Sequence, residues 1–248
     1  MKPSVLAVAA ALALVAQPLT AQTTSPTQDR FKFVGVLPGA PIIYGNIVGV
    51  PYLGSFDTAP NVWGSPFFIW CVDYDHRIAT GNTYDVWISP LDGTDFSKTL
   101  MGKNGQATQN GVSTITEYRW AAYIAGKMDW WVNSANKTRD GDAEAAIWAL
   151  LGYGPTPTTV LNTFVTNWGA QFGVGANFWT GTPALNTYQD WAIITCNPAV
   201  QPCAYQEFIY MQPGGTTEVT PEPATLTLLG TGLASVLGLR RKRRVPKP

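Results

Sequence analysis

The sequence predicts an α+β fold in which an antiparallel β-rich core carries a helical insertion of about three helices. Segments rich in β-branched and aromatic residues, which are typical of strands, lie towards both ends of residues 31–212. Between them, apolar residues recur at helical spacing, as on one face of an amphipathic helix. Strands that bracket helices favour an antiparallel sheet, whereas a regular alternation of strands and helices would favour a parallel one.

The strands are predicted from local patterns. Residues 31–54 combine β-branched and aromatic side chains with Gly and Pro, which indicates short strands and turns. The apolar run Phe67–Asp73 predicts a buried strand, and the alternating residues Thr83–Ile88 predict a half-buried one. Two further strands are predicted at Trp191–Cys196 and Tyr205–Met211.

The helical insertion is predicted from residues that suit helix ends. The pattern Thr114-x-x-Glu117 has the form of a capping box that begins the first helix. Asp140 and Asp142 lie where the positive end of a second helix would attract them. Pro157 suits the first turn of a third helix. Apolar residues at helical spacing follow each of these starts, so each helix has a face for a core.

Both ends of the chain have the composition of targeting segments. Residues 1–21 predict a secretory signal peptide, with Lys2 before an apolar stretch and the small residue Ala21 at the cleavage position. An uncleaved membrane helix is disfavoured because the apolar stretch has only about a dozen residues. Residues 22–30 and 213–220 are predicted to be polar linkers on either side of the folded part.

Residues 221–244 combine three features in a fixed order. The triplet Pro221, Glu222, Pro223 is followed by 16 uncharged residues and then by a basic cluster. The uncharged run would span about 24 Å as a helix, and the basic cluster after it should stay on the cytoplasmic side of a membrane. The cluster consists of Arg240, Arg241, Lys242, Arg243 and Arg244. Residues 245–248 form the remaining tail.

This arrangement resembles the PEP-CTERM sorting signal of Gram-negative bacteria. The resemblance implies that an exosortase, a membrane-embedded cysteine protease, recognises the motif and removes the tail. The protein would be exported, anchored transiently in the inner membrane with its folded part outside, and then passed to the cell surface or the extracellular matrix. A plain C-terminal membrane anchor is the alternative.

The formal net charge of zero hides an asymmetry, since the 16 basic and 16 acidic residues are unevenly placed. Seven basic residues, namely Lys2, Lys247 and the five of the basic cluster, lie outside residues 22–220. Nine basic residues therefore remain against 15 acidic ones in that part, which gives a net charge near −6. Such a charge disfavours nucleic acid as a partner, because phosphates are bound by basic groups.

The three cysteines divide into a pair and a single residue. Cys196 and Cys203 flank a turn-like hexapeptide, and in an exported protein this spacing predicts a disulfide. Cys71 is then left without a partner. It is either a small buried hydrophobe, as free cysteines often are, or a residue with a chemical role.

Cys71 lies in the motif Trp70-Cys71-Val72-Asp73, and the motif Ala145-Ala146-Ile147-Trp148 follows about 70 residues later. Together these motifs resemble the thioester-domain family of bacterial surface adhesins. The resemblance implies an internal thioester between the cysteine and a glutamine that begins the helix, an electrophile that captures amines. Here the corresponding position is Glu144, and a carboxylate is a poor acyl donor. The resemblance therefore implies a retained fold with a degenerate Cys71–Glu144 pair.

His76, the single histidine, lies close in sequence to Cys71, Asp73 and Asp75. A Cys71–His76 nucleophilic pair is conceivable, but the two positions would be about 16 Å apart on an extended strand. Asp73, Asp75 or Glu144 could instead serve the hydrolysis of a glycoside, for which two carboxylates must face each other at about 5–10 Å.

Asp140, Asp142 and Glu144 gather three carboxylates at a helix start, and calcium prefers such oxygen ligands. Their spacing is not that of an EF-hand, and acidic residues are expected at a helix N-terminus, so no metal or cofactor is predicted. The adjacent residues Trp130 and Trp131 diverge by about 100° on a helix, so one of them could offer a flat stacking surface to a sugar.

These observations predict an exported, exosortase-sorted protein of the cell surface or exopolysaccharide matrix, with a structural or adhesive, non-catalytic role. The expected partners are the exosortase, the inner membrane transiently, and extracellular polysaccharide or surface proteins, but not nucleic acid. Two alternatives remain open. One is a covalent adhesin that uses a Cys71 thioester, and the other is an enzyme that acts on matrix polysaccharide.

Overall fold

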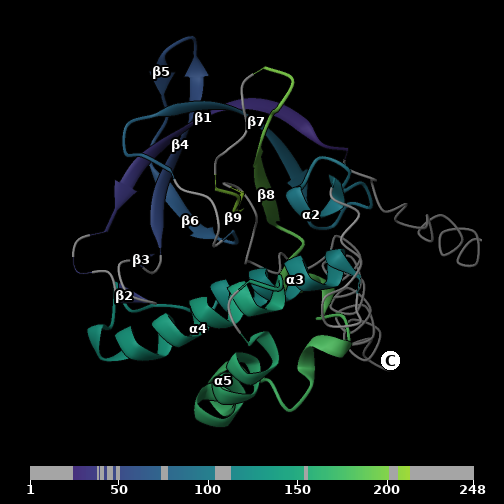
Figure 1. Ribbon diagram of the computed structural model, residues 1–248. Coiled ribbons are helices and arrows are strands. Elements are labelled where there is room, and N and C mark those ends of the chain that lie inside the picture. The colour runs from purple at the N-terminus through teal and green to yellow at the C-terminus, as the bar shows by residue number, and fades with distance from the viewer. Residues whose placement is uncertain are drawn as a thin grey trace, which may run out of the picture. The chain divides into compact units, whose positions relative to one another are not determined.

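Strands from both ends of the folded part pair into one antiparallel barrel, which the computed structural model in Figure 1 shows together with its helices. The strands follow the order β1-β7-β8-β9-β6-β4-β5, and β1 also pairs with β4. This additional pairing closes a ring of six strands, with β5 attached to β4. Every strand of the ring thus has a neighbour on both sides, which protects the backbone groups that an open sheet would expose.

The ring consists of β1 (Thr27–Val36), β4 (Tyr52–Ala59), β6 (Phe67–Cys71), β7 (Thr83–Pro90), β8 (Trp191–Cys196) and β9 (Phe208–Met211). Three two-residue strands are β2 (Ile42–Ile43), β3 (Ile47–Val48) and β5 (Val62–Trp63). The structure describes residues 25–37, 39, 42–43, 47–48, 51–73, 78–103, 113–153, 156–200 and 206–212.

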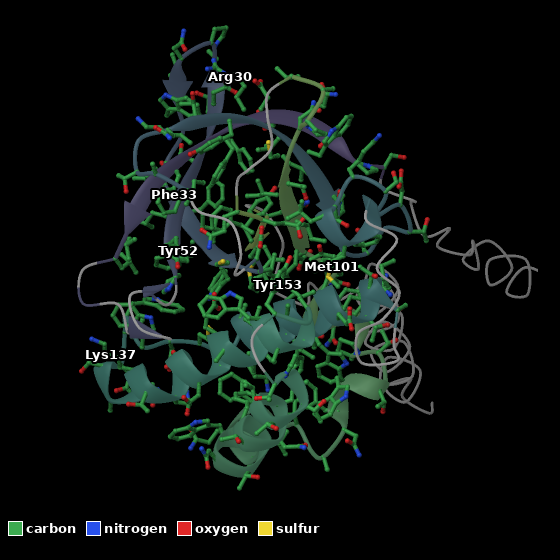
Figure 2. All side chains as sticks on the ribbon, viewed as in Figure 1. Arg30, Phe33, Tyr52, Met101, Lys137 and Tyr153 are labelled. Atoms are coloured by element: carbon green, nitrogen blue, oxygen red, sulfur yellow. The ribbon has the colours of Figure 1, made fainter. Side chains whose placement is uncertain are left out.

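Aromatic rings fill the interior of the barrel. The ring centroid of Phe208 lies 6.0 Å from those of Phe31, Phe33 and Tyr52, and Figure 2 shows Phe33 and Tyr52 among the side chains that fill this space. Gly54 lies beneath this cluster, where a Cβ atom would come within 2.4 Å of the Phe31 ring. The interior is therefore a packed core in which the absence of a side chain at Gly54 makes room for Phe31.

The described residues between β7 and β8 form four helices. They are α2 (Leu100–Lys103), α3 (Thr114–Ala125), α4 (Lys137–Leu150) and α5 (Pro157–Phe172). Short 3₁₀ helices cover Ser134–Asn136, Phe178–Thr180 and Leu185–Thr187. Within the part of the chain that the structure describes, no helix combines the length and the apolar character that crossing a membrane requires.

Helix α4 lies at the centre of the helical layer, in contact with β6 on one side and with α3 and α5 on others (Figure 1). All its residues from 143 to 150 are buried. Four of these eight are alanines, whose small side chains let neighbouring elements approach closely. The helix is thus buried over its whole circumference in this half, and Glu144 is the one residue of a charged type among these eight.

The predicted fold class is confirmed for the described residues, since an antiparallel sheet carries a helical insertion. The strands predicted to begin at Phe67, Thr83 and Trp191 and the helix predicted to begin at Pro157 all begin there. The predicted signal peptide and the hydrophobic C-terminal segment lie outside the described residues.

The predicted linker at residues 22–30 is wrong for its last four residues. Strand β1 begins at Thr27, and Thr27 to Lys32 pair with β7 in continuous register. The four residues are polar and partly exposed, so they lack the apolar pattern of a buried strand. Backbone pairing with β7 does not require apolar side chains, which is why the sequence pattern missed it. The folded domain therefore begins before residue 31.

Two predicted helix starts also differ from the structure. Ser113 rather than Thr114 caps α3, because its Oγ accepts a hydrogen bond from the backbone N–H of Thr116. Helix α4 begins at Lys137, three residues before Asp140. Asp140 still lies in the first turn of the helix, as predicted, and its carboxylate also accepts backbone N–H groups of the preceding loop.

Candidate functional site

The ends of two neighbouring strands bring Cys71 and Gln206 together. Strands β6 and β9 pair antiparallel, with Cys71 opposite Phe208, and one further backbone hydrogen bond of 3.0 Å continues the ladder. In this register Gln206 lies across from Asp73. Alternate residues of a strand share a face, so Cys71, Asp73 and Gln206 lie on the face of Phe208, which points into the barrel.

The carboxamide of Gln206 touches the thiol of Cys71. Gln206 Nε2 lies 2.6 Å from Cys71 Sγ and also donates to the backbone oxygen of Asp73 at 3.1 Å. The thiol donates to the same oxygen at 3.1 Å. The carboxamide of Gln206 and the thiol of Cys71 are therefore in direct contact.

The electrophilic carbon of Gln206 is also within reach of the sulfur. Its Cδ is bonded to Nε2 at about 1.33 Å, so it lies no farther than about 3.9 Å from Cys71 Sγ. Reacting atoms in a near-attack arrangement are roughly 3–3.5 Å apart. The upper limit on the Sγ–Cδ distance is therefore close to that separation.

Helix α4 contacts the cysteine of this pair. The indole N–H of Trp148 donates to the backbone oxygen of Cys71 at 3.0 Å. Glu144 precedes Trp148 by four residues and lies on the same face of the helix. Cys71 and Glu144 are both 0 % exposed. The structure thus places the two residues that the sequence paired in one buried region, but the group in contact with the sulfur is the amide of Gln206.

Burial dominates the electrostatics of this region. Desolvation raises the pKa of the Cys71 thiol well above its usual range, and the nearby carboxyl of Glu144 raises it further. Desolvation alone raises the pKa of Glu144 well above its usual range. Burial therefore favours the uncharged form of both groups. Among the described residues, neither carboxyl oxygen of Glu144 has a hydrogen-bond partner.

A second buried carboxyl, that of Glu207, connects the barrel to the helices beside this pair. Its oxygens accept hydrogen bonds from Leu100 N at 2.9 Å, from the hydroxyl of Thr195 and from the hydroxyl of Tyr118. Desolvation raises the pKa of Glu207 to about 7, against the opposing effect of these hydrogen bonds. Because Glu207 follows Gln206 directly, this network holds the chain in place just before β9.

The raised pKa of Glu207 predicts a pH-dependent stability. Between the usual carboxyl pKa of about 4.3 and about 7, the folded state keeps a proton that the unfolded state has lost. We therefore expect this residue to make the protein less stable as the pH rises through that window, by on the order of 3 kcal/mol. Glu207→Gln should flatten this part of the curve, measured by denaturant unfolding at pH 5 and pH 8. Other buried carboxyls contribute to the pH dependence of the wild type and of the variant alike. If the free energy of unfolding fell equally in both between pH 5 and pH 8, the assignment to Glu207 would be contradicted.

The three carboxylates considered for calcium do not converge. Asp140 accepts two backbone N–H groups of the preceding loop, at 2.6 and 2.8 Å. Asp142 accepts the indole N–H of Trp168 at 2.7 Å, and Glu144 lies in the buried region beside β6. No group of three possible metal ligands is found among the residues that the structure describes.

Of the two adjacent tryptophans, Trp130 is buried and Trp131 is half-buried. Trp131 lines an apolar pocket of about 380 Å³ together with Phe68, Trp70 and Trp191. Phe68 and Trp70 alternate with Cys71 along β6, so the pocket lies on the opposite face of the strand. A stacking surface for sugars stays a prediction.

Asp73 and Glu144 are both 0 % exposed, so neither lines an open cleft of the kind that a glycosidase needs. Cys196 is buried at the end of β8, and its disulfide with Cys203 stays a prediction. The following predicted site residues lie outside the described part of the chain: Asp75, His76, Cys203, Pro221, Glu222, Pro223, Arg240, Arg241, Lys242, Arg243 and Arg244.

The sequence reasoning missed Gln206, although the sequence holds a signal for it. Gln206 is an amide near the start of the last predicted strand, Tyr205–Met211, and just before the observed β9, and Cys71 ends a buried strand. The pairing of these two strands was not predicted, because register between distant segments is not encoded in a local pattern. With that pairing known, the two side chains are neighbours.

The geometry defines the class of site, a buried cysteine–carboxamide pair at the junction of an antiparallel barrel and a covering helix. Residues 219–244 match the PEP-CTERM protein-sorting motif, in agreement with the prediction for residues 221–244. This motif indicates an exported protein that an exosortase sorts at the membrane. No curated protein and no solved structure matches the chain. The likeness to thioester-domain adhesins is therefore not supported by any homologue.

Proposed function

We propose that the protein is an exported, exosortase-processed adhesive protein that attaches to its target through an internal thioester between Cys71 and Gln206. The observation that carries this proposal is the 2.6 Å contact between Gln206 Nε2 and Cys71 Sγ inside the barrel. The sorting motif supports a location outside the inner membrane. The role is non-catalytic, because capture of an amine consumes the thioester.

Formation of the thioester balances without a further reactant. Cys71 Sγ attacks Gln206 Cδ, so the Sγ–Cδ bond forms and the Cδ–Nε2 bond breaks. The thiol proton leaves with the nitrogen, which departs as ammonia. Glu144 would instead have to release water, and its carboxylate form is a poor electrophile. Gln206 is therefore the better acyl donor on chemical grounds as well as by contact.

Capture of an amine breaks the Sγ–Cδ bond that thioester formation made. A primary amine attacks Gln206 Cδ, the Cys71 thiol is released, and a stable amide joins the target to residue 206. Cys71 is fully buried whereas Gln206 is half-buried, so an amine can approach from the glutamine side. Primary amines occur in lysine side chains of surface proteins and in amino sugars of matrix polysaccharides. Both are consistent with an adhesive role at the cell surface or in the matrix.

A covalent attachment of this kind survives denaturation. Mature protein purified natively from producing cells is incubated with a biotin-linked primary amine and then analysed on a denaturing gel. We expect the wild-type protein to become labelled, and Cys71→Ser to remain unlabelled, because the serine hydroxyl forms no thioester. Equal labelling of the two proteins, or none of the folded wild type, would contradict the proposal.

A second candidate is a non-covalent structural role with Cys71 as an inert buried thiol. The raised pKa of Cys71 favours this candidate, because a buried uncharged thiol is a weak nucleophile. It predicts that the native protein takes up no amine and that Cys71 reacts with thiol reagents after unfolding. No observation on the described residues favours the enzyme acting on polysaccharide.

A further inference from the structure

The apolar pocket that Trp131 lines has no part in the proposed thioester. It lies where Phe67, the first residue of β6, and Met211, the last residue of β9, meet Trp191, the first residue of β8. The strand register agrees with this position, since Met211 pairs with Trp191. Ala125, the last residue of α3, lines the pocket from the helical layer. The volume of about 380 Å³ is within the range of roughly 300–1,000 Å³ that is typical of ligand sites.

The lining of this pocket favours an apolar occupant over a sugar. Every described residue of the lining is apolar or a glycine. Among their side chains, the indoles alone donate hydrogen bonds, and the buried indole N–H of Trp70 has no partner among the described residues. The hydroxyl groups of a sugar would lose their hydrogen bonds with water here and regain few, which is unfavourable. A hydrocarbon chain has no such groups to lose, and its transfer out of water is favourable.

Partly exposed apolar side chains surround the pocket. Phe67, Phe68, Trp131 and Met211 are half-buried, so each keeps some contact with water. Val132 follows Trp131 directly and is 81 % exposed. We call these five residues the apolar face. Single exposed apolar residues are common on protein surfaces, whereas a group of them around an apolar pocket indicates a site of interaction.

The charges beside the apolar face do not form a basic cluster in the described part of the chain. Lys127 is exposed on the loop before Trp131, and the carboxylate of Asp129 is paired with Arg139 at 2.7 Å. Asp190, just before β8, is half-buried. Proteins that bind membranes through charge carry several clustered basic residues. Contact of this face with lipid therefore has to depend on apolar burial, and it should change little with salt.

The place of the apolar face in the chain brings it close to a membrane. Met211 belongs to this face and ends β9, so the chain leaves the barrel here. Ala224, which begins the uncharged run of the sorting segment, follows Met211 by 13 positions, a stretch that spans at most about 47 Å. The sorting motif indicates that the protein is sorted at the membrane. A short tether of this kind gives lipid a high effective concentration at the apolar face.

We propose that the apolar face docks on the outer leaflet of the inner membrane, with the acyl chains of phospholipids as the occupant of the pocket. Tryptophan side chains suit this position, since they are enriched where membranes meet water. Docking holds the folded domain against the membrane while the tail is attached. Cleavage of the tail removes the tether, which weakens the docking and releases the domain. This inference does not depend on the thioester, because the pocket and the Cys71–Gln206 pair lie on opposite faces of β6.

Tryptophan fluorescence can test the docking on the full-length chain. All ten tryptophans lie between positions 63 and 191, so their fluorescence reports on the folded domain and not on the targeting segments. The full-length protein is reconstituted into phosphatidylcholine vesicles whose acyl chains carry bromine, which quenches tryptophan on contact. We expect quenching relative to unbrominated vesicles, with little change at high salt. The mature protein, purified natively and added to the same vesicles, should be quenched less because it lacks the tether.

Val132→Asp places a charge on the apolar face without disturbing the core, since the side chain is exposed. It should shift the docking equilibrium towards the free domain at least about tenfold, as expected from the loss of one buried valine. Val200→Asp is the matched control, because Val200 is 60 % exposed and lies beyond the other end of β8 from Trp191. It should be quenched as the wild type is, and circular dichroism should show both variants folded.

Three results would overturn the inference. Equal fluorescence of the full-length wild type in brominated and unbrominated vesicles excludes lipid as the occupant and leaves the face to a protein such as the exosortase. Equal quenching of Val132→Asp and Val200→Asp places the contact outside the apolar face. Quenching that is equally strong for the mature protein contradicts release by cleavage.

Discussion

Gln206→Glu is expected to abolish thioester formation and, with it, all covalent capture of amines. The variant presents a carboxylate to Cys71, and a carboxylate repels the nucleophile and has no ammonia to release. Its side chain has nearly the same size and shape, so the packing of the barrel is kept, while the hydrogen bond that Gln206 Nε2 donates to the backbone oxygen of Asp73 is lost. Intact mass and uptake of the biotin-linked amine measure the effect, and we expect both signals to fall to background.

Gln171→Glu is the matched control for this substitution. Gln171 is exposed on α5, so Gln171→Glu introduces the same negative charge away from the barrel. It should form the thioester as the wild type does. The assignment of the acyl donor would be overturned if Gln206→Glu still captured amine while Glu144→Gln did not, because Glu144 would then be the residue joined to Cys71.

Trp148→Ala is expected to produce the largest loss of stability. The side chain is 1 % exposed and lies between the barrel and the helices. Removing a buried tryptophan leaves a cavity and typically lowers the free energy of unfolding by about 3–5 kcal/mol. Denaturant unfolding monitored by circular dichroism measures the change.

Trp148→Phe separates packing from hydrogen bonding at the same position. It keeps most of the ring but removes the donor to the Cys71 carbonyl, which should lower the free energy of unfolding by about 1–3 kcal/mol. Trp168→Phe is the control, because Trp168 is only half-buried and donates to Asp142 nearer the surface. A smaller loss for Trp148→Ala than for Trp168→Phe would contradict the central position of Trp148.

The elements with strong local patterns could be predicted from the sequence. The alternation along β7 and the apolar runs of β6 and β8 each indicate a strand that the structure contains, and Pro157 marks the start of α5. Closure of the barrel could not be predicted. It depends on the pairing of β1 with both β4 and β7, and the polar residues that begin β1 give no sign of it.

The candidate site, like the fold, could be predicted from the sequence only in part. The two motifs around Cys71 and Trp148 indicated that a strand and a helix meet, and the hydrogen bond between these residues agrees with that expectation. The resemblance assigned the acyl donor to the helix, at Glu144. The structure instead brings a carboxamide from the neighbouring strand to the sulfur. Contacts that depend on the register of two distant strands require the fold before they can be seen.

The intact mass of the mature protein, purified natively from producing cells, tests the central claim most directly. We predict the mass of a chain cleaved near residues 221–223, reduced by the two hydrogens of a disulfide and by one ammonia. Treatment with methylamine should add one methylamine, and peptide mapping should place it on residue 206. A protein of undiminished mass apart from the disulfide, which methylamine leaves unchanged, would contradict the thioester and favour the inert buried thiol.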